Sequence, residues 1–172
     1  MKNKIMVLSM VGGVLAGYVW AASGKAVIKG TAADSKISGD VVFMEEKDGL
    51  RIKAIFLNVS PGKHGFHIHE NGSCDDMGKA AGGHFNPDGS EHGYLPKQGH
   101  QHAHAGDMGN IKISENGTGS LDVLLPGLAL KEGKYAIAGR SIILHEKSDD
   151  FGQPTGNAGG RIGCGVIEEV VK

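Results

Sequence analysis

Histidine is the residue type in this sequence with the strongest chemical signal. Eight of the nine histidines lie between His64 and His104, and the ninth is His145. In an extended strand, side chains two positions apart point to the same face. His67 and His69 would therefore present two imidazole rings side by side. Because imidazole is a good ligand for copper, zinc, iron and nickel, this spacing predicts a specific transition-metal site.

A loose histidine tract that scavenges metal is the alternative interpretation of the same cluster. Such a tract would have low complexity and no strand pattern. Here Phe66 and Ile68 alternate with the histidines. The alternation favours a strand with one apolar face and one metal-binding face.

Seven side chains could supply the ligands of such a site. They are His67, His69, His84, His92, His104, Asp107 and His145. Two four-coordinate ions need about eight bonds, and seven groups supply them if one imidazole bridges both ions through its two nitrogens. A carboxylate among neutral imidazoles favours tetrahedral zinc, whereas an all-imidazole set that is open at one position favours copper(II). The count permits a dinuclear site and does not establish one.

The sequence around these side chains is typical of short strands separated by turns. Glycine is abundant, with 29 residues, and no long helical period occurs. Strands are expected at residues 26–30, 41–45, 50–57, 63–70, 110–114, 121–125, 135–145 and 163–171, with a hairpin turn at 46–49. This pattern predicts an all-β fold, an eight-stranded Greek-key sandwich or barrel. Two long irregular stretches, from 71 to about 106 and from 146 to 160, are expected to be functional loops.

The first 22 residues differ from the rest. Lys2 and Lys4 precede a largely apolar run at 5–20, and Ala21 and Ala22 follow it. This pattern predicts a secretory signal peptide at 1–22 and a single domain at 23–172. An uncleaved membrane anchor is the alternative, but the run is short for a spanning helix. We expect a periplasmic or secreted protein with no stable membrane anchor after cleavage.

Charge and cysteine content narrow the function further. Without Lys2 and Lys4 the chain has 16 basic and 19 acidic residues, a formal charge of −3, which gives no indication of nucleic-acid binding. In an exported protein the cysteine pair, Cys74 and Cys164, predicts a disulfide. A reduced pair of metal ligands is the alternative.

Six segments of the chain resemble the copper/zinc superoxide dismutases and stand in that family's order. They are H-G-F-H-I-H-E (64–70), A-G-G-H-F-N-P (81–87), H-G (92–93), H-A-G-D-M-G-N (104–110), L-H-E (144–146) and G-N-A-G-G-R-I-G-C-G-V-I (156–167). Each segment alone is a weak signal, but together they are specific and cover nearly the whole mature chain.

The resemblance implies one copper and one zinc ion per chain. His67, His69 and His145 match the copper ligands, and His84 matches the imidazolate that bridges both metals. The remaining zinc ligands are matched by His92, His104 and Asp107. Asp149 matches a carboxylate that hydrogen-bonds ligand histidines of both metals, and Thr155 matches a threonine of the substrate channel. Cys74 and Cys164 match the family's disulfide.

The activity that the resemblance implies is superoxide dismutation. Two superoxide anions and two protons give dioxygen and hydrogen peroxide, with copper cycling between oxidation states. Arg161 matches the guanidinium that guides superoxide, and His84 is expected to carry a proton. A non-catalytic copper-binding or storage module on the same fold is the alternative. A copper-only variant would lack His92, His104 and Asp107. We expect a homodimer, with a monomer as the alternative.

Three histidines fall outside the ligand set. His64 would reach the ligand face only through the irregular Gly65, and in the family this position braces the backbone. His100 and His102 are two residues apart and have no counterpart in the resemblance; they could bind an additional metal, bind another molecule or be inert. The 146–160 stretch is short and lacks the family's usual spread of charged steering residues, so electrostatic steering should depend on Arg161 and on lysines from elsewhere.

Overall fold

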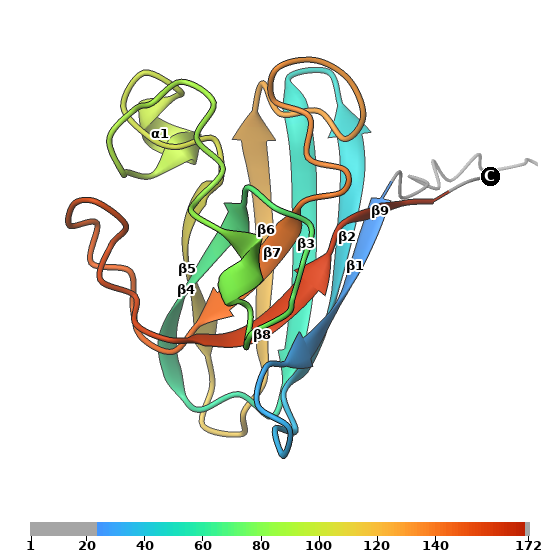
Figure 1. Ribbon diagram of the computed structural model, residues 1–172, viewed down its shortest axis with the longest axis vertical. Helices are drawn as coiled ribbons and strands as arrows, with labels where there is room; N and C mark the ends of the chain where they lie inside the picture. The colour runs from blue at the N-terminus through green and yellow to red at the C-terminus, as the bar shows by residue number, and fades with distance from the viewer. Residues whose placement is uncertain (1–23, 171–172) are drawn as a thin grey trace, which may run out of the picture.

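The computed structural model describes residues 24–170, which form a closed antiparallel β-barrel (Figure 1). Its strands are β1 (Gly24–Gly30), β2 (Ser38–Glu46), β3 (Gly49–Leu57), β4 (Gly62–His69), β5 (Asp107–Ile113), β6 (Gly119–Pro126), β7 (Ser141–His145), β8 (Arg161–Val166) and β9 (Glu168–Glu169). Neighbours follow the order β2-β3-β6-β5-β4-β7-β8-β1-β9, and β1 also pairs with β2. That last pairing closes the barrel, and β9 is a short extra strand. The prediction of an eight-stranded all-β fold is confirmed.

Several strand boundaries differ from the predicted ones, and three of the differences bear on the site. The strand expected at 135–145 is β7 alone, because the chain turns before it at Gly133 and Gly139, whose φ values are 93° and 78°. The strand expected at 163–171 divides into β8 and β9, because the intervening Ile167 donates its backbone N–H to Arg140. The strand expected at 110–114 is β5, which already begins at Asp107.

The core follows the alternation that the sequence contains. Phe66 and Ile68 of β4 are fully buried in the main hydrophobic cluster, where Phe66 meets Phe56 edge-on with ring centroids 5.3 Å apart. Burying one such side chain stabilises the fold by about 1.5–3 kcal/mol. The opposite face of β4 carries His67 and His69, which are also buried. The long loops therefore cover the outer face of this strand.

Both long loops lie on the same side of the barrel (Figure 1). The first contains the short helices η1 (Lys79–Ala81) and α1 (Leu95–Gln98), and Leu95 fixes it to the core with a fully buried side chain. The second connects β7 to β8. Within residues 24–170 no helix is long and apolar enough to cross a membrane. The predicted signal peptide at 1–22 lies outside the described residues.

Two register shifts in the sheet occur at histidine positions. The pairing of β4 with β5 is irregular between Gly65 and His67, and the pairing of β7 with β8 is irregular between Leu144 and His145. A bulge inserts an extra residue and redirects the neighbouring side chains. These irregularities turn His67 and His145 toward each other, with ring centroids 5.0 Å apart.

Candidate metal centre

Two groups of buried donors share one histidine. The first is His67, His69, His84 and His145, and the second is His84, His92, His104 and Asp107. Within each group the donor atoms all lie within 4.8 Å of one another. Every residue in the two groups is buried, with at most 7% of its surface exposed. The seven side chains singled out in the sequence are therefore brought together, with His84 common to both groups.

The first group presents imidazole nitrogens to a common point. Nε2 of His69 and Nε2 of His145 are 3.3 Å apart. Nδ1 of His69 lies 3.0 Å from the carbonyl oxygen of Gly82, and Nδ1 of His145 lies 3.5 Å from that of Gly159. Because a carbonyl only accepts, each Nδ1 carries the proton and each Nε2 offers a lone pair. Nδ1 of His67 is buried with no hydrogen-bond partner. An all-imidazole set of this kind suits copper.

The second group converges on a carboxylate. Nδ1 of His84 and Nδ1 of His104 lie 2.8 and 3.2 Å from Oδ1 of Asp107. Nδ1 of His92 lies 2.9 Å from Oδ2 yet makes no hydrogen bond, although it is buried. The backbone N–H groups of Gly93 and His104 hold Oδ2 in place, at 2.9 and 3.0 Å. Three imidazoles and one carboxylate are a set that fits tetrahedral zinc. Since Nδ1 of His84 faces Asp107, its Nε2 is left for the first group.

Asp149 connects the two groups. Nε2 of His67 donates to Oδ2 of Asp149 at 2.9 Å, and Nε2 of His92 donates to Oδ1 at 3.0 Å. Because a carboxylate accepts only, both rings carry their proton on Nε2 and direct Nδ1 into the donor groups. The backbone of Asp149 is held by the amide side chain of Asn110, which accepts at 2.7 Å and donates at 2.8 Å.

Burial and neighbouring charges determine the protonation state of each donor, and so which donors can bind a metal at neutral pH. Burial lowers the pKa of His84 to about 4 and that of His145 to about 2, with neighbouring histidines contributing. Burial also opposes the charged form of His92, but Asp107 and Asp149 outweigh it and raise the pKa of His92 to about 9. Burial opposes ionisation of Asp107 as well, yet its histidine neighbours hold its pKa well below the usual range. At neutral pH, His84 and His145 are therefore neutral, Asp107 is ionised, and His92 must lose a proton to bind a metal.

A pocket of about 180 Å³ opens onto the first group. It is lined by His69, Gly83, His84, His145, Thr155, Asn157, Ala158, Gly159 and Arg161. Arg161 is the one lysine or arginine among these lining residues. Its Nη1 donates to the carbonyl oxygen of Gly78 and its Nη2 to that of Gly82, each at 2.5 Å. Both predicted channel residues, Thr155 and Arg161, therefore line the same pocket as His69, His84 and His145.

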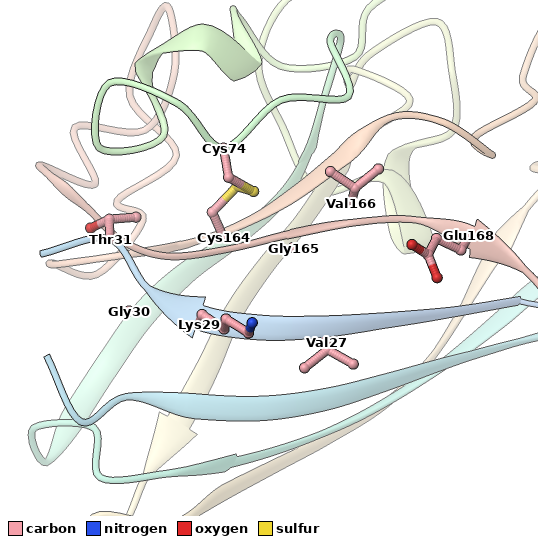
Figure 2. Close-up of a pocket in the computed structure, with 9 residues that line it drawn as sticks. All are labelled: Val27, Lys29, Gly30, Thr31, Cys74, Cys164, Gly165, Val166 and Glu168. Carbon is pink, nitrogen blue, oxygen red and sulfur yellow. A yellow bond between two sulfur atoms is a disulfide. The ribbon is translucent and has the colours of Figure 1, made fainter. Parts of the chain in front are cut away.

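The predicted disulfide between Cys74 and Cys164 is formed, with a Cα–Cα distance of 5.7 Å. Figure 2 shows the Cys74 side chain reaching from the first long loop to Cys164 on β8. Arg161 lies three residues before Cys164, and its carbonyl acceptors follow Cys74 along the loop. The bond thus ties Arg161 and its acceptors together. The hollow beside it, about 330 Å³, is lined by Val27, Lys29 and Glu168 among others and lies apart from the donor groups.

His64 lies outside both donor groups and bridges two backbone carbonyls. Its Nδ1 lies 2.8 Å from the carbonyl oxygen of His145, and its Nε2 lies 2.9 Å from that of Ser60. His100 and His102 belong to no group of possible metal donors within the described residues. His102 is exposed, whereas His100 stacks on Tyr135. The geometry gives no support to an additional metal site at these two histidines.

Three contacts of the site were not foreseen from the sequence. Besides Asn110, Gln153 holds the backbone of His92 through two hydrogen bonds of 2.9 Å. The backbone N–H of Phe151, a residue with a φ of 62°, donates to Oδ1 of Asp149 at 2.8 Å. Asn110 stands in one of the family-like segments, but no local pattern marks Gln153 or Phe151.

Comparisons with known proteins agree with this geometry. A family model described as "Copper/zinc superoxide dismutase (SODC)" matches residues 37–167. The extracellular superoxide dismutase [Cu-Zn] of Caenorhabditis elegans is 38% identical over an alignment of 143 residues, and the match covers 79% of this chain and 63% of that relative's length. The crystal structure of the clock protein EA4 matches with a TM-score of 0.75 and 34% identity, over 90% of this chain and 98% of that one. The chain belongs to the copper/zinc superoxide dismutase family.

Proposed function

We propose that this protein is an exported superoxide dismutase that binds one copper and one zinc ion per chain. The observation that carries the proposal is the pair of buried donor groups that share His84. These groups lie beside a pocket that is lined by the positively charged side chain of Arg161. Neither group lacks a donor, which weighs against a copper-only variant. The fixed cation at the pocket favours an enzyme over a copper-storage module, since storage has no need of a substrate anion site.

The donor chemistry assigns a metal to each group. His67, His69, His84 and His145 would hold copper, and His84, His92, His104 and Asp107 would hold zinc. The buried, unpartnered Nδ1 atom of His67 fits this assignment, because a lone pair without a hydrogen-bond donor is available to a cation. Nδ1 of His92 would offer its lone pair once that ring has lost its second proton. When bound, copper would accept an electron from one superoxide and donate an electron to a second.

Arg161 would bind and orient the substrate. Two carbonyl oxygens hold its guanidinium, so its position is set before an anion arrives. Burial lowers its pKa, but arginine remains charged in proteins. A fixed charge at the mouth of a pocket raises the encounter rate of a small anion. Thr155 lines the same pocket and would limit the size of the species that enters.

His84 would supply a proton to the reduced substrate. Its ring lies between the two donor groups and lines the pocket. Burial lowers the pKa of His84 to about 4, so a proton placed on Nε2 is given up readily at neutral pH. Reduction of superoxide to hydrogen peroxide consumes two protons, and the second would come from solvent.

Export is supported by the disulfide, since such bonds persist in oxidising compartments. The Caenorhabditis elegans relative is also extracellular by name. N-terminal sequencing of the mature protein tests cleavage near residue 22. The homodimer stays a prediction, which light scattering on the purified protein would test.

Metal analysis combined with a dismutation assay tests the function. We expect one copper and one zinc per chain and cyanide-sensitive activity. Arg161→Ala should lower kcat/KM by roughly tenfold or more and flatten its salt dependence, whereas Arg161→Lys should keep the salt dependence with a reduced rate. Lys53→Ala, at an exposed position on β3, is the matched control. A fully metallated but inactive protein would support the storage module, and unchanged kinetics in Arg161→Ala would remove Arg161 from the mechanism.

A further inference from the structure

His100 belongs to neither donor group, and its ring makes one stacking contact and one hydrogen bond elsewhere. Its ring stacks on the ring of Tyr135, with centroids 3.8 Å apart and an interplanar angle of 14°. Its Nε2 donates to the carbonyl oxygen of Pro126 at 2.9 Å, and its Nδ1 is buried without a partner. The ring therefore packs between Tyr135 and the C-terminal end of β6.

Tyr135 is held from a second direction by the same loop. Its hydroxyl donates to Oδ2 of Asp88 at 2.8 Å. The other oxygen of Asp88 accepts from Nζ of Lys134. The two arms of the loop are also joined directly, because the Ser90 hydroxyl donates to the carbonyl oxygen of His100 at 2.5 Å. Asp88 and His100, twelve residues apart, thus hold one tyrosine between them.

The segment between these contacts carries part of the second donor group. His84 precedes the segment, His92 lies within it, and His104 follows it by four residues. Ordering a loop costs conformational entropy for every residue that becomes fixed. If nothing else held this loop, the binding of the metal would have to offset that cost, and metal affinity would fall.

We propose that Asp88, His100 and Tyr135 form a clasp that holds the zinc-binding loop in its ligating shape before the metal binds. The clasp residues are positioning residues, since none of them touches a donor atom of the second group. The inference rests on the proposed function only in naming zinc as the ion. It assigns a role to His100 that the family resemblance does not supply.

Hydrogen exchange of the metal-free protein and zinc release from the loaded protein test the clasp. His100→Ala and Tyr135→Ala should speed amide exchange in peptides from 85–104 and speed zinc release to a chromogenic chelator by roughly tenfold, the size expected for one ring pair plus one hydrogen bond. His100→Phe and Tyr135→Phe each keep a ring and should give smaller effects. Lys131→Ala is the matched control, because this exposed lysine pairs with Glu169 outside the clasp.

The outcomes separate the clasp from ordinary destabilisation. The double variant His100→Ala/Tyr135→Ala should release zinc faster than either single variant but by less than the product of the two separate effects, because both changes remove the same ring stack while each also removes its own hydrogen bond. Unchanged exchange and release in both alanine variants would overturn the proposal, and so would faster exchange spread equally over β2 and β3. If the alanine variants do not fold, the two phenylalanine variants decide by the same criteria. A protein that binds no zinc would contradict the proposed function, while exchange at 85–104 would still test the clasp.

Discussion

Replacing Asp149 by asparagine should lower the affinity of the first donor group for copper more than the affinity of the second donor group for zinc. The carboxylate accepts from Nε2 of His67 through Oδ2, from Nε2 of His92 chiefly through Oδ1, and from the backbone N–H of Phe151 through Oδ1. An asparagine keeps one acceptor oxygen and replaces the other with a donor. The oxygen should occupy the Oδ1 place, where two donors need it. The amide nitrogen then faces Nε2 of His67.

The size of the effect follows from the lost partner. Either the Nε2–H of His67 loses its acceptor, or the ring changes tautomer and places a proton on Nδ1, the atom that faces the donor group. Loss of the partner that orients a metal-binding histidine typically lowers metal affinity about 10–100-fold, which corresponds to about 1.4–2.8 kcal/mol. An unsatisfied buried donor costs about 1–3 kcal/mol, which agrees in size. His92 keeps its acceptor, so zinc affinity should change less.

Chelator competition at fixed pH measures both affinities on the same preparations. Asp150→Asn is the matched control, because this neighbouring carboxylate is exposed and bonds Gly152 and Asn157 without touching either donor group. Equal copper affinity in Asp149→Asn and the parent protein would refute the reasoning. A larger loss of zinc than of copper would refute the assignment of the amide orientation.

Two further predictions concern stability. Replacing both Cys74 and Cys164 by serine should lower the free energy of unfolding by about 4–5 kcal/mol, because the bond closes a loop of 90 residues; urea unfolding measures this, and a loss below about 1 kcal/mol would contradict the estimate. The metal-free protein should be most stable near pH 6.5. His84 and His145 have folded-state pKa values of about 4 and about 2, below the 6.5 of the unfolded chain, so unfolding takes up protons and stability falls as the pH drops from 6.5 toward 4. The raised pKa of His92, about 9, contributes stability that is complete below pH 6.5 and lost as the pH rises through 9. Urea midpoints that rise steadily from pH 4.5 to 9 would contradict this pattern.

The strands were predictable where their pattern is local. Phe66 and Ile68 alternate with His67 and His69, and alternation is a property of neighbouring residues along one strand. The prediction for 135–145 was wrong because apolar residues such as Ile137 also occur in a buried turn, where periodicity alone does not separate the two. The strand predicted at 110–114 begins three residues earlier, at Asp107, because nothing adjacent to Asp107 shows that it pairs with His67 of β4.

The contacts that shape the site lie far apart along the chain. Asp149 is 82 residues from His67 and 57 from His92. Gln153 is 61 residues from the backbone group it holds, and His100 is 35 residues from Tyr135. No local pattern marks pairs at such separations, so these partners were found only in the folded chain, apart from Asp149, which the family resemblance indicated.

The sequence by itself determined the β character of the fold, the cysteine pair and the set of seven donor side chains, because residue type and alternation are local properties. The tertiary structure decided which nitrogen of each ring points inward. Acceptors at Asp149, Gly82 and Gly159 take one ring proton each and so direct the opposite nitrogen into the donor groups. It also separated His100 from the donors and packed it on Tyr135. A histidine has two nitrogens that differ only in their partners, and those partners come together only when the barrel closes.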